Sequence, residues 1–313
     1  MAAHDARMRP GGCVAFNILL RSLPPNKFES EKESHRRKMT PAPISKIVEC
    51  SVVCGCLLYL TLQQEQRCQT LVLGTTAAYA VLYSVLRSTT LLQPAKGSLS
   101  YANEAEWRSR ILATINALLL IGGSILCFLE WPYRPNSEGW IGEPDNIWSY
   151  PCLFASFLVG YLHWDLIWLV WHRREQHDMS AVIHHVLFIS VTHYVLSGTY
   201  FKKPFAWLSF TELSTPFLNI RWFYAANNMK EGRGYVLASL LFASTFLLTR
   251  VLGYGFGMLD LLWSYGEWKS NRGLHFVAVG LGLGYALNLF WSVKVIQALQ
   301  RAFKRDVPKS KRK

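Results

Sequence analysis

Apolar residues along this chain gather in eight blocks that are separated by short polar segments. Each block is close to the roughly 20 residues that an α-helix needs to cross the hydrocarbon core of a bilayer. The pattern predicts an all-α, polytopic membrane protein with eight or so spans, of which the first is the weakest because Lys46 and Glu49 lie at its start. The blocks cover residues 45–63, 70–92, 111–130, 149–171, 181–199, 204–226, 234–258 and 274–299.

Lysine and arginine are distributed unevenly among the segments between these blocks. Twenty-three of the thirty-three basic residues lie in the two tails and in the loops on their side, whereas six lie in the opposite loops. Loops that are rich in Lys and Arg face the cytoplasm. We therefore expect both termini to be cytoplasmic, and a chain without the span 45–63 would place its basic N-terminal segment on the wrong side.

The two tails account for much of the net charge of +13. No patterned basic and aromatic face accompanies this charge, so we expect attraction to anionic lipid and no nucleic-acid partner. Residues 1–44 mix Pro, Gly, Ser and charges of both signs, which is typical of a disordered cytoplasmic tail. Residues 301–313 form a second basic tail. Its end, Lys309-Ser-Lys311-Arg-Lys313, is similar to the dilysine retrieval signal of endoplasmic-reticulum membrane proteins, and the alternative is a solvated tail attracted to lipid.

The cysteines and glycines indicate packing rather than a redox or metal site. The seven cysteines imply no disulfide framework, because the total is odd and several lie inside apolar blocks. Cys54 and Cys56 project from different faces of a helix, so no metal site is predicted. The G-x-x-x-G segments at Gly253–Gly257 and Gly280–Gly284 favour close contact between helices.

Polar residues inside or beside the predicted spans are the strongest functional signal. An ionisable group there costs roughly 2.5–3.5 kcal/mol on insertion, so each needs a functional or structural reason. A Glu–Arg pair is more often a packing device than a catalytic one. Tandem histidine favours function for one of the two, because an imidazole packs no better than Leu but can act as a base, nucleophile or ligand. The set is His163, Asp165, Asp178, His184, His185, Glu212, Asn219, Arg221 and Arg250.

The helical rise per residue gives the expected depths of these groups. Five of them fall roughly 5–10 Å inside the cytoplasmic face, whereas Glu212 and Arg250 share a level roughly 20 Å or more from it and could neutralise each other. Glu212 and Asn219 are seven residues apart and are expected on one helix face. His163 and Asp165 are about 200° apart around a helix, so they cannot both point into one cavity. The five shallow groups are Asp165, His184, His185, Asn219 and Arg221.

Several of these residues belong to short motifs that resemble the TLC-domain family, over roughly 105–300. The chain is most similar to the small TLC-domain-containing transmembrane proteins, whose roles are in endoplasmic-reticulum and membrane lipid homeostasis, rather than to true ceramide synthases. The motifs are Glu106-Trp-Arg-Ser-Arg110, Gly160-Tyr-Leu-His-Trp-Asp165, His184-His185, Glu212-Leu-Ser-Thr-Pro-Phe-Leu-Asn-Ile-Arg-Trp-Phe223 and Asn288-Leu-Phe-Trp291.

The resemblance implies a six-helix bundle that encloses a lipid-accessible cavity, here preceded by two further transmembrane helices at 45–92. It also implies that His184 and His185 match the paired histidines that carry acyl transfer in ceramide synthases. Those enzymes have a paired Asp downstream, where this chain has Glu212 followed by Ser214 to Asn219. The resemblance therefore extends less well to N-acylation of sphingoid bases.

Two functions of different classes follow. In the first, the protein is an acyltransferase: His185 is the general base, Asp178 or Asp165 orients an imidazole, and Asn219 with Arg221 stabilises negative charge. Acyl-coenzyme A would be the co-substrate, with no bound cofactor. In the second, the protein binds, senses or carries a lipid without catalysis. Polar groups, which include His163 and Glu212 as candidate substrate contacts, would then hold the lipid headgroup. A secondary transporter is a third reading, for which Pro216 lacks a counterpart in another half of the chain.

Overall fold

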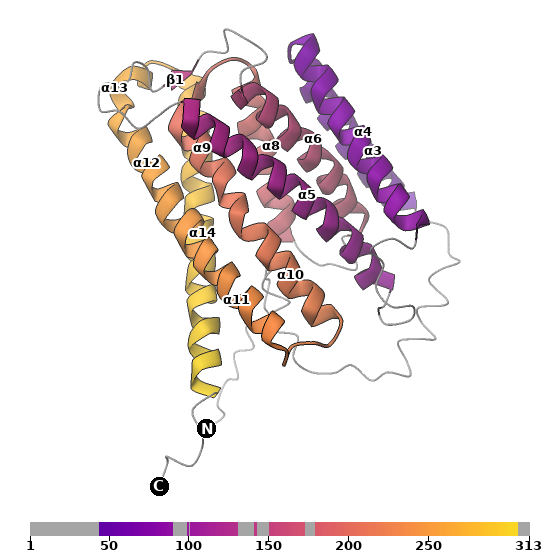
Figure 1. The fold of residues 1–313 in the computed structure, drawn as a ribbon. Coiled ribbons are helices and arrows are strands. Elements are labelled where there is room, and N and C mark those ends of the chain that lie inside the picture. The colour runs from indigo at the N-terminus through magenta and orange to yellow at the C-terminus, as the bar shows by residue number, and fades with distance from the viewer. Residues whose placement is uncertain are drawn as a thin grey trace, which may run out of the picture.

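The computed structural model describes residues 44–89, 99, 101–130, 141–142, 150–172 and 179–305. Residues 1–43 and 306–313 of the predicted tails lie outside the described residues, as does Asp178, whereas 301–305 continue the last helix. The described chain is a bundle of helices whose long axes run roughly parallel, with α14 extending beyond the others at the lower end (Figure 1).

All eight predicted apolar blocks fall on helical segments. The first half contains α3 (Ile44–Leu62), α4 (Gln66–Ser88), α5 (Tyr101–Glu130), β1 (Ile141–Gly142), α6 (Tyr150–Trp171) and α8 (Met179–Leu196). The second half contains β2 (Tyr200–Phe201), α9 (Lys202–Phe210), the 3₁₀ turn η1 (Thr211–Ser214), α10 (Thr215–Ala226), α11 (Arg233–Phe246), the π-helix η2 (Leu247–Gly253), α12 (Tyr254–Trp263), α13 (Tyr265–Trp268) and α14 (Arg272–Arg305).

The all-α, polytopic architecture is confirmed. Among the described residues, six helical segments are long and apolar enough to cross a membrane. The apolar part of α8, Ala181–Leu196, is shorter, and the block 204–226 is divided among α9, η1 and α10. The count of eight spans therefore stays a prediction. Between the helices, β1 and β2 make one short antiparallel pairing, with Ile141 opposite Phe201.

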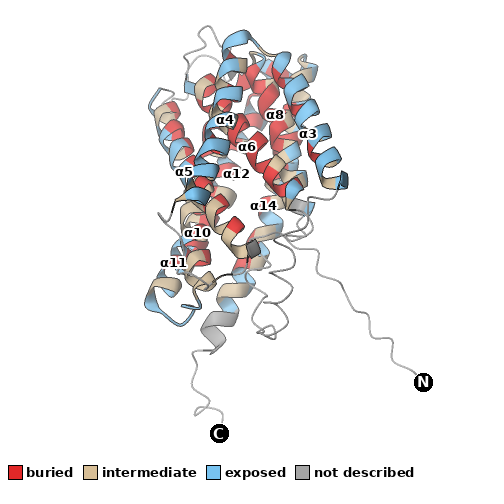
Figure 2. Ribbon diagram, turned by 90° about the vertical axis from the view of Figure 1, so that its right-hand side faces the viewer, coloured by how far each residue is buried: buried red, intermediate tan, exposed pale blue. Residues whose placement is uncertain are grey.

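Helix α6 is the centre of the bundle. Seventy-two per cent of its apolar window is buried, against 17% for α3 and 11% for α4, so α6 packs against protein while the leading hairpin presents most of its surface outward. Figure 2 shows this contrast, with α6 largely buried behind the exposed α3 and α4. The outward residues include Ile44, Val52 and Tyr59, and such a continuous apolar surface suits contact with lipid.

Glycines bring the helices of the second half close together, as the G-x-x-x-G segments predicted. A β-carbon on Gly253 would lie 2.7 Å from the Trp207 ring, and one on Gly257 would lie 3.2 Å from the Trp207 β-carbon. A β-carbon on Gly280 would lie 2.4 Å from Val191. Helix α12 therefore packs tightly on α9, and α14 on α8, because these positions lack side chains.

Two helical segments change their winding at the same place in the bundle. The path from α9 to α10 tightens into η1, after which Pro216 lies in the first turn of α10, where its missing N–H is not needed. The path from α11 to α12 loosens into the π-helix η2. Single π-turns inside α-helices often mark functional sites. Glu212 lies on η1 and Arg250 on η2, so both charged groups are presented by irregular turns.

Candidate functional site

A cavity of about 200 Å³ lies inside the bundle, between α5, α6, α8, α9, η1, α10, η2 and α14. Apolar side chains such as Leu158, Leu162 and Phe188 line part of the wall. Hydroxyl, ionisable and amide groups line the rest, and the ionisable and amide groups are unusual for an intramembrane space and indicate a place for a polar ligand. These groups are Asn116, Asp165, His184, His185, Glu212, Arg250 and Asn288.

Asp165 on α6 and His185 on α8 are in direct contact. His185 Nε2 lies 2.8 Å from Asp165 Oδ2, and each side chain is 12% exposed. His185 Nδ1 lies 2.7 Å from the Ala181 carbonyl oxygen, one turn earlier. The Ser109 hydroxyl donates to Asp165 Oδ1 over 3.4 Å. Because a carbonyl oxygen only accepts, His185 Nδ1 donates the hydrogen bond to Ala181. The proton in the other hydrogen bond is then shared between His185 Nε2 and the Asp165 carboxyl group. Both nitrogens of His185 are therefore engaged.

His184 lines the same cavity but has a different environment. Its Nδ1 is buried and has no hydrogen-bond partner among the residues that the structure describes. The ring packs 4.5 Å from Phe188 and 5.9 Å from Trp291, centroid to centroid, and lies nearly perpendicular to His185. An imidazole that is fixed by aromatic contacts and retains an unbonded nitrogen can accept a proton from a ligand.

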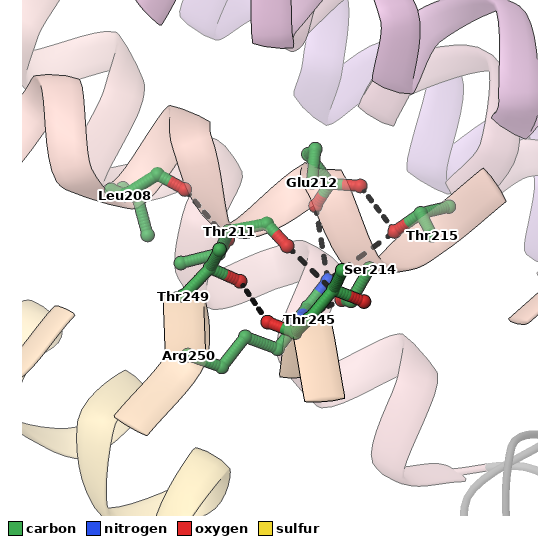
Figure 3. A network of polar contacts seen from close by, with 8 residues as sticks. All are labelled: Leu208, Thr211, Glu212, Ser214, Thr215, Thr245, Thr249 and Arg250. Carbon is green, nitrogen blue, oxygen red and sulfur yellow. Dashed lines mark hydrogen bonds and ion pairs between the residues drawn. The ribbon is translucent and has the colours of Figure 1, made fainter. Parts of the chain in front are cut away.

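Glu212 and Arg250 form the second polar wall, shown in Figure 3. Arg250 Nη2 lies 3.4 Å from Glu212 Oε1, and Arg250 Nε donates to the Ser214 hydroxyl over 2.9 Å. The Thr215 hydroxyl donates to Glu212 Oε2 over 2.6 Å. The predicted Glu212–Arg250 pairing is confirmed. Because the Ser214 and Thr215 hydroxyls also accept hydrogen bonds from Arg250, more than the ion pair holds the guanidinium at the cavity edge.

The structure brings together two groups of residues that the sequence placed at different depths. Asp165, His184 and His185 line one cavity together with Glu212 and Arg250, so the depths predicted for the two groups do not keep them apart. Counting residues along straight helices ignores both helix tilt and side-chain length. The charged residues at the two levels consequently reach one space.

Asn219 does not join the cavity, contrary to the prediction. Its side-chain oxygen accepts from Arg110 Nη1 over 3.0 Å, and its nitrogen donates to the Thr114 hydroxyl over 2.9 Å, so it links α10 to α5. Glu106 in turn binds Arg110 at 2.7 Å. The tighter winding of η1 rotates α10 relative to Glu212, and the expected common face of Glu212 and Asn219 is lost.

Arg221 also lies away from the cavity. It donates from Nε to the Ser239 hydroxyl over 3.0 Å and from Nη2 to the Tyr235 hydroxyl over 2.8 Å, which fixes α10 against α11. The prediction that Arg221 meets the tandem histidines is therefore wrong. Its position two residues beyond Asn219, about 200° around α10, turns it toward a different neighbour.

His163 lies outside the cavity that Asp165 lines, as the angle between the two positions on α6 predicted. It stacks on His193 with ring centroids 5.2 Å apart, and the two residues are 2% and 5% exposed. It is not among the residues that line the cavity, so its predicted role as a substrate contact has no support in the geometry.

Two amides that line the cavity were not among the predicted site residues, although Asn288 opens one of the family-like motifs. Asn116 on α5 accepts from the Tyr79 hydroxyl over 3.3 Å, which connects the cavity to α4. Asn288 on α14 has a buried side-chain oxygen with no partner in the described part of the chain. An amide within a predicted span was the available signal for both. Within the described ranges, no three His, Cys, Asp or Glu side chains cluster in a manner that could hold a metal ion.

Comparison with known proteins gives a consistent family relationship. Residues 106–297 match the family model described as the TLC domain. TLC domain-containing protein 4 A of Dictyostelium discoideum is 24% identical over 252 residues, which cover 77% of this chain and 93% of that protein. TLC domain-containing protein 4 of Xenopus tropicalis is 25% identical over 74% of this chain and 91% of its own length, and the human protein of that name is 26% identical over 53% and 63%. No solved structure matches.

Proposed function

This chain belongs to the TLC-domain family, and on that premise we propose that it is a lipid-modifying enzyme that transfers an acyl group inside its polar cavity. The observation that carries the proposal is the imidazole of His184, which lines the cavity with a buried and unbonded Nδ1. The Asp165–His185 pair and the Glu212–Arg250 pair line the same cavity. His163 and His193 also have an unbonded buried nitrogen in the described chain, but of these three only His184 lines the cavity, where a ligand can come next to its ring.

His184 would be the general base. It takes a proton from the amine or hydroxyl of the acceptor lipid while that group attacks the thioester carbonyl of acyl-coenzyme A. The new amide or ester bond forms, the carbon–sulfur bond breaks, and the coenzyme A thiolate leaves with the proton from His184. This assignment differs from the role first expected for His185, because both nitrogens of His185 are already engaged.

Other cavity groups would assist by charge. Arg250 and the Asn288 amide line the cavity and can donate to the oxygen that becomes negative during attack. The Asp165–His185 pair can supply or hold a proton next to His184. A volume of about 200 Å³ is small, below the roughly 300–1,000 Å³ of pockets that enclose a drug-sized ligand. We therefore propose that only the reacting polar groups enter, while the acyl chains remain among the helices and lipid.

A non-catalytic lipid-binding role is the second candidate, and one observation favours it. The charged groups in the cavity are matched in two pairs, Asp165 with His185 and Glu212 with Arg250. A lining of paired, hydrogen-bonded groups forms a stable polar compartment that can hold a lipid headgroup without catalysing a reaction. In this case the family role in lipid homeostasis would come from sensing or carrying the lipid.

The experiment that separates the two uses purified protein in lipid nanodiscs that contain a cellular lipid extract. Isotope-labelled long-chain acyl-coenzyme A is added, and labelled lipid products are measured by mass spectrometry. We expect a labelled product with the wild type and a loss of about 10²–10⁴-fold with His184→Ala. His193→Ala, a buried histidine on the same helix outside the cavity, is the matched control and should retain activity.

Two results would contradict acyl transfer. One is a lipid that co-purifies with the wild type but never acquires label with any acyl donor, which would favour the binding role. The other is equal product formation by the wild type and His184→Ala. The same lipid should remain bound to His184→Ala if the substitution removes chemistry alone.

We also propose residence in the endoplasmic reticulum, on the basis of Lys309 and Lys311 near the C-terminus. Changing both residues to Ser should let a tagged protein leave that compartment, as seen by microscopy. Serine substitution of Lys304, which lies outside the retrieval pattern, serves as the control. An unchanged distribution of the double variant would contradict this use of the tail.

A further inference from the structure

Two cysteines from distant parts of the chain meet at one end of the contact between α4 and α6. Cys68 Sγ lies 3.4 Å from Cys152 Sγ, and the residues are 1% and 5% exposed. Each is the third residue of its helix. Both are thiols in the structure. A disulfide needs a sulfur–sulfur distance of about 2.05 Å, so a small side-chain adjustment would close the gap.

The helix contact around the pair is closely packed and fixes the positions of the two cysteines. A β-carbon on Gly160 would lie 2.5 Å from the Thr75 β-carbon, which shows how near α6 approaches α4. The Thr76 hydroxyl donates to the Gly160 carbonyl oxygen over 3.1 Å. Farther along, Tyr79 contacts Trp164 with ring centroids 6.1 Å apart. The two helices therefore run side by side in one direction, with the cysteines at their shared starting end.

The expected orientation of the chain places this end in an oxidising environment. Helix α4 starts after the turn that follows α3, and α6 starts after the segment 131–149. With both termini in the cytoplasm, these two starting ends face away from it. The space on that side is the lumen of the secretory pathway or the cell exterior, where disulfides form and persist.

We propose that Cys68 and Cys152 are joined by a disulfide that ties the α3–α4 hairpin to α6. The two thiols lose two protons and two electrons as the sulfur–sulfur bond forms, and a disulfide of a lumenal thiol oxidoreductase takes them up to become two thiols. The bond forms before packing buries the cysteines. It is independent of any activity of the cavity.

The physical effect of such a bond is large because of its place in the sequence. The two cysteines are 84 residues apart, so the bond would close a long loop and restrict the unfolded chain. The hairpin otherwise has much exposed surface and little burial, and α6 is the helix that it contacts most. The bond would therefore secure a weakly buried hairpin to the central helix.

The test counts oxidised thiols in the full chain. Cells that express the tagged protein are dissolved in denaturant with N-ethylmaleimide to block free thiols. The protein is then reduced and labelled with a polyethylene-glycol maleimide, and each new thiol adds one gel shift. We expect a double shift for the wild type and for Cys127→Ser, a buried cysteine in the same apolar cluster. Cys68→Ser and Cys152→Ser should show none.

Either of two outcomes would overturn the proposal. The first is the absence of any shift for the wild type, since this means that every thiol was free. The second is a double shift that survives Cys68→Ser but disappears in Cys127→Ser, because a different pair would then be bonded. If the variants fail to accumulate, a proteolytic digest of the wild type still tests the proposal. A peptide beginning at Cys68 that is linked to the peptide containing Cys152 would support the bond. The same two peptides found unlinked would contradict it.

A thermal measurement then checks what the bond does. Purified Cys127→Ser protein should unfold several degrees lower in the presence of dithiothreitol than in its absence. Cys68→Ser should unfold at one temperature under both conditions. Equal unfolding temperatures for Cys127→Ser with and without reductant would show that the bond does not secure the hairpin.

Discussion

Helices α6 and α8 touch through two histidine contacts that differ in almost every respect. On the cavity side, His185 of α8 meets Asp165 of α6 at 2.8 Å, and Ser109 supports the carboxyl. On the other side, His163 of α6 stacks on His193 of α8, and the Nε2 atoms of both rings are buried without a partner in the described chain. One contact is a hydrogen-bonded, charge-matched pair at a cavity, and the other is a packed pair of rings.

A histidine within a span does not by itself mark a site. All four histidines on these two helices were costly to insert, and yet only two line the cavity. What separates them is the chemistry of their neighbours: a carboxyl and a polar space on one side, another imidazole and apolar residues on the other. Variants of the cavity side should therefore affect charge balance, whereas variants of the other side should affect packing alone.

The largest expected effect concerns Glu212, because its partner cannot lose its charge. Glu212→Gln leaves the Arg250 guanidinium without a counter-charge in a partly buried place, and arginine stays protonated in proteins. The expected loss in free energy of unfolding is about 3–5 kcal/mol, the usual range for a broken buried pair. Abundance in detergent extracts and thermal unfolding would measure it.

Removal of the other partner, Arg250, gives the control for the Glu212→Gln prediction. Arg250→Met leaves a carboxyl that can take up a proton, so its charge penalty should be smaller than that of Glu212→Gln. The double variant should recover part of the loss, as the two changes remove the charges together. Normal accumulation of both single variants would show that the pair carries little stability.

Much of the cavity lining could be predicted from the sequence, but two predicted site residues were placed wrongly. The pairing of Glu212 with Arg250 followed from their shared depth, and the separation of His163 from Asp165 followed from helical angles. The placing of Asn219 failed because the 3₁₀ turn η1, which carries Glu212, departs from 100° per residue, and Arg221 lies about 200° around α10 from Asn219. Periodicity holds only while a helix is regular, and this chain interrupts two helices at the cavity itself.

The pair of Cys68 and Cys152 shows a second limit of sequence reasoning. The odd number of cysteines indicated no disulfide framework, and no local pattern connects two residues 84 positions apart. Their meeting depends on the parallel packing of α4 on α6, which a glycine contact at Gly160 sets. Long-range helix pairing is not encoded in the periodicity of either helix alone.

The next effect in size is expected on the cavity side of the α6–α8 contact. Asp165→Asn removes the negative charge but keeps the shape, and His185 can respond by giving up a proton. The loss should therefore be limited to that of a charge-assisted hydrogen bond, about 1.5–3 kcal/mol in the free energy of unfolding. Ser109→Ala, which removes only the longer contact of 3.4 Å, is the matched control and should lose less. A loss for Asp165→Asn as large as that for Glu212→Gln would mean that His185 keeps its charge.

The smallest effect is expected on the other side, where the two stacked histidines can be replaced by rings of similar size. His163→Phe and His193→Phe should keep the aromatic contact, whose ring centroids lie 5.2 Å apart in the wild type. Each change also removes an Nε2 atom that is buried without a partner in the described chain. Phenylalanine is slightly larger than histidine, so some overpacking offsets the gain from removing a buried polar atom. Each variant should change the free energy of unfolding by less than about 1.5 kcal/mol, as is usual for swaps that nearly conserve volume.

Product formation in the nanodisc assay should remain at the wild-type level, because neither ring lines the cavity. Thermal unfolding and labelled acyl transfer measured on the same preparation would check both statements. A loss of activity in His163→Phe at unchanged stability would show that the two sides of α6 act as one site, and the contrast between them would no longer hold.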